Sequence, residues 1–236
     1  MPIPYVGAEI DKSALVIVDM QNDFVHPDGR LGHRALENPD AKIDMPFLMS
    51  TIPHVKRLAE AFRRAGRPVV YVTHVLRADY SDAAFPFWRA ARHLTTGPRT
   101  FLVEGSWGAR IVDDLKPEPG DHSVVKKGFG GFANTPLDTI LRNLGVTTCV
   151  MAGVTTCVCV STTIRQGVEY NYRMIIVRDA VAEVHRDTHE AELKTGAHLC
   201  RREDDRRGDR AAATGLSRHT LYAAVGAYRR APSCQS

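Results

Sequence analysis

Two cysteines, Cys157 and Cys159, lie directly after a predicted strand-to-helix turn. Residues 147–153 (TTCVMAG) form an apolar run that ends in glycine and predicts a buried strand. The residues after it predict a helix, for which Thr155 and Thr156 are candidate caps. Free N–H groups and the helix dipole at such a turn lower the pKa of a thiol and can stabilise an oxyanion. The alternative is that both cysteines are small buried apolar residues, as most cysteines are.

An acid and a lysine end two other predicted strands. Residues 14–19 (ALVIVD) predict a central parallel strand with Asp19 at its carboxyl end. Residues 122–126 predict a short strand that ends at Lys126 and is followed by Lys127. In parallel sheets, ligands bind outside the carboxyl ends of the strands, so we expect Asp19, Lys126 and a cysteine to share one site.

Together these three side chains have the chemistry of a nucleophilic triad. The ammonium would favour the thiolate, which is the reactive form of cysteine. The carboxylate would take the thiol proton and later return it to a leaving amine, while backbone N–H groups hold a tetrahedral oxyanion. Taken singly, Asp19 could instead brace a loop and Lys126 could be a solvated charge, so the prediction depends on their convergence.

Strands and helices alternate from residue 14 to residue 195, which predicts an α/β fold with a parallel sheet covered on both faces. The other predicted elements are strands at residues 68–75 and 173–179 and helices at residues 52–65, 136–144 and 187–195, the last with Asp187 as its N-cap. Residues 29–49 show no clean period. Residues 77–106 form a long, aromatic and irregular segment, and loops of this length are usually functional in compact domains.

The composition of the 236 residues, with 44% hydrophobic and 25% charged, is that of an ordinary globular protein. No apolar run is long enough to span a membrane and no signal peptide is recognisable, so we expect a cytoplasmic protein with reduced thiols. The residues from 201 onward contain eight arginines and four acids, which accounts for the whole formal charge of +4. The folded body is therefore neutral and gives no reason to expect nucleic-acid binding or membrane binding.

We expect a domain at residues 1–195 and an atypical Arg-rich tail at residues 196–236. The tail has no convincing buried strand, so five good strands and an atypically docked end are expected. Its composition is typical of a reading-frame change in the coding sequence, although a natural divergent tail is the alternative. Residues 221–228 (LYAAVGAY) could pack as a helix.

Three motifs in this order resemble the isochorismatase-like superfamily: VDMQNDF, V-x-K-x-x-x-G-G-F-x-x-T and GVTTCVCVSTTIR. More narrowly they resemble its cysteine-hydrolase branch. The resemblance covers about residues 14–195 and implies a three-layer α/β/α fold with a six-stranded, mostly parallel sheet.

Matched to the family motifs, the catalytic residues fall on Asp19, Lys126 and Cys159, which leaves Lys127 and Cys157 as bystanders. The resemblance also implies a non-proline cis peptide bond between Val154 and Thr155. That bond would turn the Thr155 N–H inward, beside the N–H of Cys159, to form the oxyanion hole.

The resemblance implies an amidohydrolase that acts through a thioester on a small linear ureide or carboxamide, such as a biuret-like or ureidoacrylate-like compound. The alternatives are a vinyl-ether hydrolase of the isochorismatase type and a catalytically impaired binding protein of the same fold. Gln21 and Asn22 are candidates to hydrogen-bond a carbamoyl group. The other candidate substrate-binding residues are Phe24, Trp88, Phe132 and Val154; for the aromatic residues a place in the core is the alternative.

We expect no cofactor and no metal. Nicotinamidases of this family hold a metal through an aspartate and histidines, whereas His26, His33 and His54 are scattered in this sequence. The expected partner is a small-molecule substrate. The family resemblance implies a homodimer or homotetramer.

Overall fold

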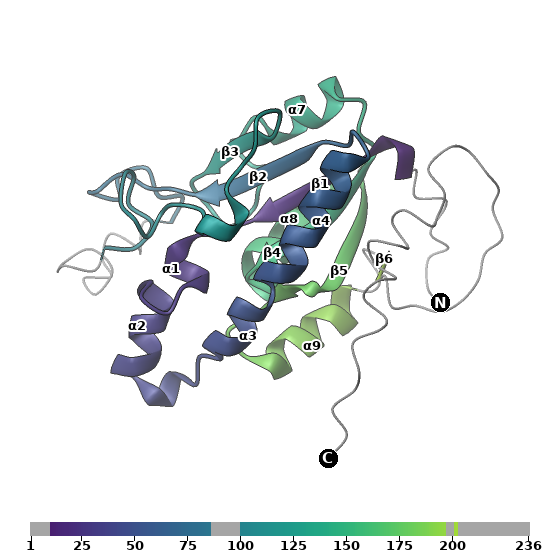
Figure 1. Cartoon of the computed structure of the whole chain (residues 1–236). Coiled ribbons are helices and arrows are strands. Elements are labelled where there is room, and N and C mark those ends of the chain that lie inside the picture. The colour runs from purple at the N-terminus through teal and green to yellow at the C-terminus, as the bar shows by residue number, and fades with distance from the viewer. Residues whose placement is uncertain (1–9, 86–99, 197–200, 203–236) are drawn as a thin grey trace, which may run out of the picture.

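A parallel sheet forms the centre of the protein (Figure 1), which is known from a computed structural model that describes residues 10–85, 100–196 and 201–202. The strand order is β3-β2-β1-β4-β5-β6, and every neighbouring pair is parallel. The strands are β1 (Ser13–Val18), β2 (Val69–His74), β3 (His122–Lys126), β4 (Thr148–Val154), β5 (Arg173–Ala182) and the two-residue β6 (Arg201–Arg202). The predicted α/β class and parallel sheet are confirmed.

The strands are buried because helices cover both faces of the sheet. In β1, Leu15 and Ile17 belong to one apolar cluster, whereas Val16 and Val18 belong to the other. Successive side chains of a strand point to opposite faces, so a continuous apolar run is what a doubly covered strand requires. Residues of α4 complete the first cluster and residues of α7 and α8 the second, which gives the three predicted layers.

The helices are α1 (Asn22–Val25), α2 (Arg30–Glu37), α3 (Met45–Ser50), α4 (Ile52–Arg64), α7 (Leu137–Asn143), α8 (Ser161–Glu169) and α9 (Arg186–Gly196). Short 3₁₀ turns lie at η1 (Ile10–Lys12), η2 (Pro39–Ala41) and η3 (Asp113–Leu115), and a π-helical turn, η4 (Thr156–Val160), leads into α8.

The sequence made no prediction for two helices, and it misplaced the start of another. The segment with no clean period, residues 29–49, contains α2 and most of α3; α2 buries only Gly32, with Leu31 and Ala35 partly buried against the first cluster, so its apolar face is small. The last helix begins at Arg186, which places Asp187 in its first turn instead of at the N-cap.

The end of the described chain follows the expectation of five full strands. The sixth strand, β6, adds only the pairs Ile175–Arg201 and Ile176–Arg202 at the edge beside β5. The helix predicted at residues 221–228 lies outside the described residues, as does the rest of the tail beyond residue 202. Within the described chain, every helix is too short or too polar to cross a bilayer.

Candidate active site

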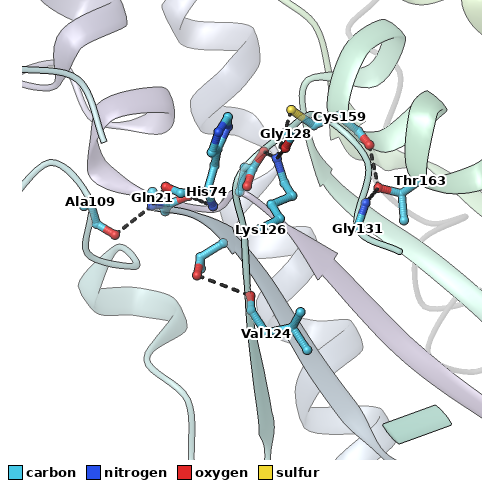
Figure 2. Close-up of polar contacts among 11 residues, drawn as sticks. Gln21, His74, Ala109, Val124, Lys126, Gly128, Gly131, Cys159 and Thr163 are labelled. Atoms are coloured by element: carbon cyan, nitrogen blue, oxygen red, sulfur yellow. Dashed lines mark hydrogen bonds and ion pairs between the residues drawn. The ribbon is translucent and has the colours of Figure 1, made fainter. Parts of the chain in front are cut away.

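Asp19, Lys126 and Cys159 meet at the carboxyl ends of the strands. Asp19 directly follows β1, Lys126 is the last residue of β3, and Cys159 lies in η4 just after β4. The Lys126 Nζ is 2.9 Å from the Asp19 Oδ2 and 3.4 Å from the Cys159 Sγ. A third contact, 3.0 Å to the Gly128 carbonyl oxygen, fixes the ammonium, which points toward Cys159 in Figure 2.

Burial dominates the electrostatics of this triad. Asp19 and Lys126 are fully buried and Cys159 is 4% exposed. Burial raises the pKa of Asp19 against the opposing attraction of Lys126. Burial alone would lower the pKa of Lys126, but attraction to Asp19 and Cys159 outweighs it, and the pKa is raised. The ammonium is therefore held in its charged form next to an acid of increased basicity.

The expected activation of the thiol in the free protein is not found. Burial, together with the neighbouring Asp19 carboxylate, raises the pKa of Cys159, and Lys126 offsets only part of that shift. In predicting the thiol pKa from the sequence, we considered the helix terminus and the lysine, but not the desolvation of a fully enclosed sulfur. At neutral pH the resting site therefore contains a thiol, and a base must remove its proton.

The turn that carries Cys159 has the backbone expected from the resemblance. The Val154–Thr155 peptide bond is cis, which confirms that prediction. The N–H groups of Val158 and Val160 both donate to the Thr155 carbonyl oxygen, at 3.3 and 3.1 Å. Thr155 occupies the N-cap position of η4, as predicted, but its side chain makes no capping hydrogen bond. The Thr156 hydroxyl is instead 2.9 Å from His189 Nδ1 of α9.

The family is identified by comparison with known proteins. Residues 13–202 match the family model described as the isochorismatase domain. The chain belongs to the isochorismatase family. The ureidoacrylate amidohydrolase RutB of Methylobacterium radiotolerans is 35% identical over 175 residues, which are 70% of this chain and 65% of that protein. This chain thus spans slightly less than two thirds of that relative's length.

Two solved structures narrow the assignment within the isochorismatase family. A cysteine hydrolase from Pseudomonas syringae pv. phaseolicola is similar with a TM-score of 0.73 and 28% identity, covering 86% of this chain and 93% of that one. The N-carbamoylsarcosine amidase from Thermoplasma acidophilum is similar with a TM-score of 0.63 and 32% identity, covering 84% of this chain and 99% of that one. The chain lies in the cysteine-hydrolase branch of the isochorismatase family.

The predicted polar substrate ligands are occupied by protein contacts. The Gln21 amide nitrogen donates to the carbonyl oxygens of His74 at 2.9 Å and Ala109 at 2.7 Å, and its oxygen accepts the His74 N–H at 2.9 Å. Figure 2 shows this amide wedged between the two chain segments. The Asn22 amide donates to the Trp107 carbonyl oxygen at 2.8 Å. These contacts favour bracing of the site loops over recognition of a carbamoyl group.

The predicted apolar ligands are divided between the two faces of the sheet. Phe24 packs edge-on against Phe101 in the first cluster, which also contains the fully buried Val154. Phe132 is stacked on Tyr170 and belongs to the second cluster, together with Cys159. Trp88 lies outside the described residues.

Sequence reasoning missed three buried polar residues around the site. His74 pairs with Lys126 in the register of β2 and β3, and burial lowers its pKa to about 2, so it is neutral. Asp23 accepts the N–H groups of Arg30 and Leu102, which joins the start of α2 to the end of the long aromatic segment. Glu183 follows β5 and contacts η4. Only Asp23 lies in a recognisable motif; the other two are brought to the site by strand register.

The described residues contain no group of three or more His, Cys, Asp or Glu side chains arranged to hold a metal ion. The triad itself consists of a carboxylate, an ammonium and a thiol, with the ammonium 2.9 Å from the Asp19 Oδ2. The site has the chemistry of acid–base and nucleophilic catalysis by protein side chains.

Proposed function

We propose that this chain is a cysteine amidohydrolase that cleaves a C–N bond of a small linear ureide or carboxamide through a thioester at Cys159. The observation that carries the proposal is the contact of one buried ammonium with both a carboxylate, at 2.9 Å, and a thiol sulfur, at 3.4 Å. A purely structural ion pair would not require a cysteine as its third member.

In the first half-reaction, Asp19 takes the proton of the Cys159 thiol, and the sulfur attacks the carbonyl carbon of the substrate. The raised pKa of Asp19 makes this carboxylate a stronger base than an exposed aspartate, and Lys126 stabilises the thiolate as it forms. The carbonyl oxygen becomes an oxyanion, for which the N–H groups of Thr155 and Cys159 are the proposed donors. Collapse of this intermediate breaks the C–N bond, and the proton on Asp19 goes to the leaving amine or ammonia.

In the second half-reaction, water replaces the amine. Asp19 accepts a proton from the water molecule, whose oxygen attacks the thioester carbonyl carbon. The C–S bond then breaks, and the sulfur recovers a proton from Asp19. A carboxamide yields a carboxylate at this stage. A ureide yields a carbamate, which decomposes to carbon dioxide and ammonia if the amine left first, or to carbon dioxide and the amine if ammonia left first.

The names of the relatives support a ureide as the substrate. Ureidoacrylate amidohydrolase and N-carbamoylsarcosine amidase both name substrates that carry a carbamoyl group. Ureidoacrylate-like and biuret-like compounds are therefore the proposed class. Residues 1–195 are the proposed catalytic domain, acting in a homodimer or homotetramer without a cofactor.

The test is ammonia release from biuret, ureidoacrylate, N-carbamoylsarcosine, nicotinamide and simple carboxamides. Wild type, Cys159→Ala and the matched Cys157→Ala variant are compared. Hydroxylamine is added in a parallel reaction to intercept the acyl-enzyme, as a hydroxamate where the substrate is a carboxamide and as a hydroxyurea where it is a ureide. We expect one ureide to be turned over, Cys159→Ala to abolish turnover, and Cys157→Ala to retain most of it.

Other outcomes would contradict the proposal in distinct ways. Turnover of a vinyl-ether substrate that survives Cys159→Ala would indicate a hydrolase of the isochorismatase type. Ammonia release with neither hydroxamate nor hydroxyurea formed in the presence of hydroxylamine would argue against the covalent intermediate at Cys159. A folded protein that acts on nothing in either panel would indicate a binding protein that has kept the fold.

A further inference from the structure

A second buried carboxylate, Glu183, holds the turn that carries the nucleophile. Glu183 is 2% exposed. Its Oε2 accepts the backbone N–H of Cys157 at 2.8 Å and the Cys157 thiol at 2.7 Å, and its Oε1 accepts the N–H of Val184 at 2.9 Å. Three hydrogen bonds to one buried carboxylate are strong because the acceptor is charged.

An irregularity in β5 places Glu183 beside this turn. Met151 of β4 pairs with Ile176 of β5, so an unbroken register would pair Val154 with Asp179. The observed partner of Val154 is Ala182, because the register shifts between Met151 and Gly153. The three inserted residues bring Glu183, which follows directly, next to the start of η4. β-bulges often re-aim side chains near active sites in this way.

The contact matters because it ties the backbone of η4 to the residue that follows β5. Val158 and Val160 both donate to Thr155 within the turn itself, and the Cys159 carbonyl oxygen accepts the Thr163 hydroxyl of α8 at 2.7 Å. The Cys157 N–H is thus the backbone donor of the turn that is tied to β5. A displacement there would move Cys159, two residues on, relative to Lys126.

We propose that Glu183 is a positioning residue, which fixes the Cys157 end of η4 and thereby sets the Cys159 thiol and amide against Asp19 and Lys126. The inference rests on the proposed function of Cys159 as the nucleophile. Glu183 touches neither the triad nor the reacting atoms in this scheme.

The same carboxylate gives the two neighbouring cysteines different contacts. Burial and Glu183 raise the pKa of Cys157 to about 12, so this thiol stays protonated and donates its hydrogen to Glu183. Cys157 therefore serves as an anchor point, whereas Cys159 alone faces the lysine.

The experiment compares Glu183→Gln with Glu190→Gln in the full chain. Glu190 pairs with Arg178 at the surface. Glu190→Gln therefore makes the same chemical change at a carboxylate outside η4. Glutamine keeps the shape of glutamate but removes the charged acceptor. One readout is kcat and KM on the amide that wild type turns over. The other, which needs no substrate, is the rate of iodoacetamide alkylation of Cys159 at pH 9, assigned by fragmentation of the peptide containing both cysteines.

We expect Glu183→Gln to lower kcat by about ten- to a hundredfold and to change KM by less than about twofold. This loss corresponds to one charge-assisted hydrogen bond. We expect alkylation of Cys159 to slow by about tenfold, because the sulfur loses its contact with Lys126. Glu190→Gln should change neither value. Unchanged kcat and alkylation in folded Glu183→Gln would overturn the proposal, as would faster alkylation, which would mean that the turn had merely opened.

Two further arms keep the result decisive. If Glu183→Gln does not fold, Glu183→Asp is tested instead; it keeps the charge but withdraws the acceptor by one methylene. A loss of kcat or of the alkylation rate of about threefold or more then supports the inference, whereas wild-type values overturn it. If wild type turns over no amide, the alkylation rates alone decide. Slower alkylation in Glu183→Gln would then support positioning even though the proposed function had failed.

Discussion

Replacing Lys126 with methionine removes the only charge that compensates Asp19 in the described site. Both side chains are fully buried, 2.9 Å apart, and methionine approximates the volume of the lysine stem. The substitution therefore isolates the charge from the packing. It leaves a carboxylate in an apolar surrounding, which must then stay ionised at high cost or take up a proton.

The magnitude follows from the burial. Removing one partner of a fully buried ion pair costs about 3–5 kcal/mol of the free energy of unfolding. The pH dependence has a definite sign. With the ammonium gone, burial is opposed only by the hydrogen bonds from Cys159 and His74, so the folded pKa of Asp19 rises further above its ordinary value. Between the unfolded and the folded pKa of Asp19, the folded variant binds more protons than the unfolded chain. Its stability therefore falls as pH rises through that range. The deficit relative to wild type is smaller at pH 5 than at pH 8.

The assay is urea unfolding followed by far-UV circular dichroism, for wild type, Lys126→Met, Asp19→Asn and the double variant, at pH 5 and pH 8. We expect the double variant to recover most of the stability that Lys126→Met loses and to show little of its added pH dependence. A Lys126→Met deficit that is equal at both pH values, or that the double variant does not repair, would refute the assignment of the loss to an uncompensated Asp19 charge.

Three further outcomes are expected. Alkylation of wild-type Cys159 should accelerate steadily from pH 7 to pH 10, because its pKa is raised by burial; a plateau near pH 7 would contradict this. Gln21→Ala should lower the free energy of unfolding by about 1–3 kcal/mol, measured in urea, because it orphans buried backbone groups. Gly153→Ala should lower the free energy of unfolding by about 3 kcal/mol or more, because its Cβ would lie 2.0 Å from the Val18 carbonyl oxygen and the residue has a φ of +113. Gly66→Ala, which has open space at a φ of +63, should lower it by about 1 kcal/mol. Equal losses of Tm in the two variants would contradict the steric argument.

The sequence was sufficient for the sheet because buried parallel strands have a plain signature. The predicted strand at residues 122–126 has the observed bounds, and those at residues 14–19 and 68–75 are within one residue of β1 and β2 at each end. The convergence of Asp19, Lys126 and a cysteine could be predicted for the same reason, because Asp19 and Lys126 lie at the ends of such strands and the two cysteines follow a third. The choice of Cys159 over Cys157 came from the resemblance to the family motifs. Where a helix buries little, as α2 does, no pattern was available to find it.

The surroundings of the triad could not be predicted, because they depend on contacts between distant segments. Gln21 was assigned to the substrate on its residue type, but its three partners come from residues 74 and 109. The position of Glu183 depends on a register shift in β5 that leaves no local signal. The raised pKa of Cys159 likewise follows from enclosure by the whole fold, which the residue types around it do not reveal.

The strand order also explains why a lysine occupies the middle of the triad. β2 lies between β1 and β3, so the residues that end β1 and β3 are separated by two strand spacings, about 10 Å. A short side chain on β3 would end above β2. The four-carbon stem of Lys126 crosses it and places the ammonium against Asp19, while β4, on the other side of β1, delivers Cys159 to the same nitrogen. Reach and charge are both required. A glutamine at position 126 is shorter and neutral, so it should fail to stabilise the thiolate even if the protein folds, and a Lys126→Gln variant that alkylates at the wild-type rate would contradict this account of the site.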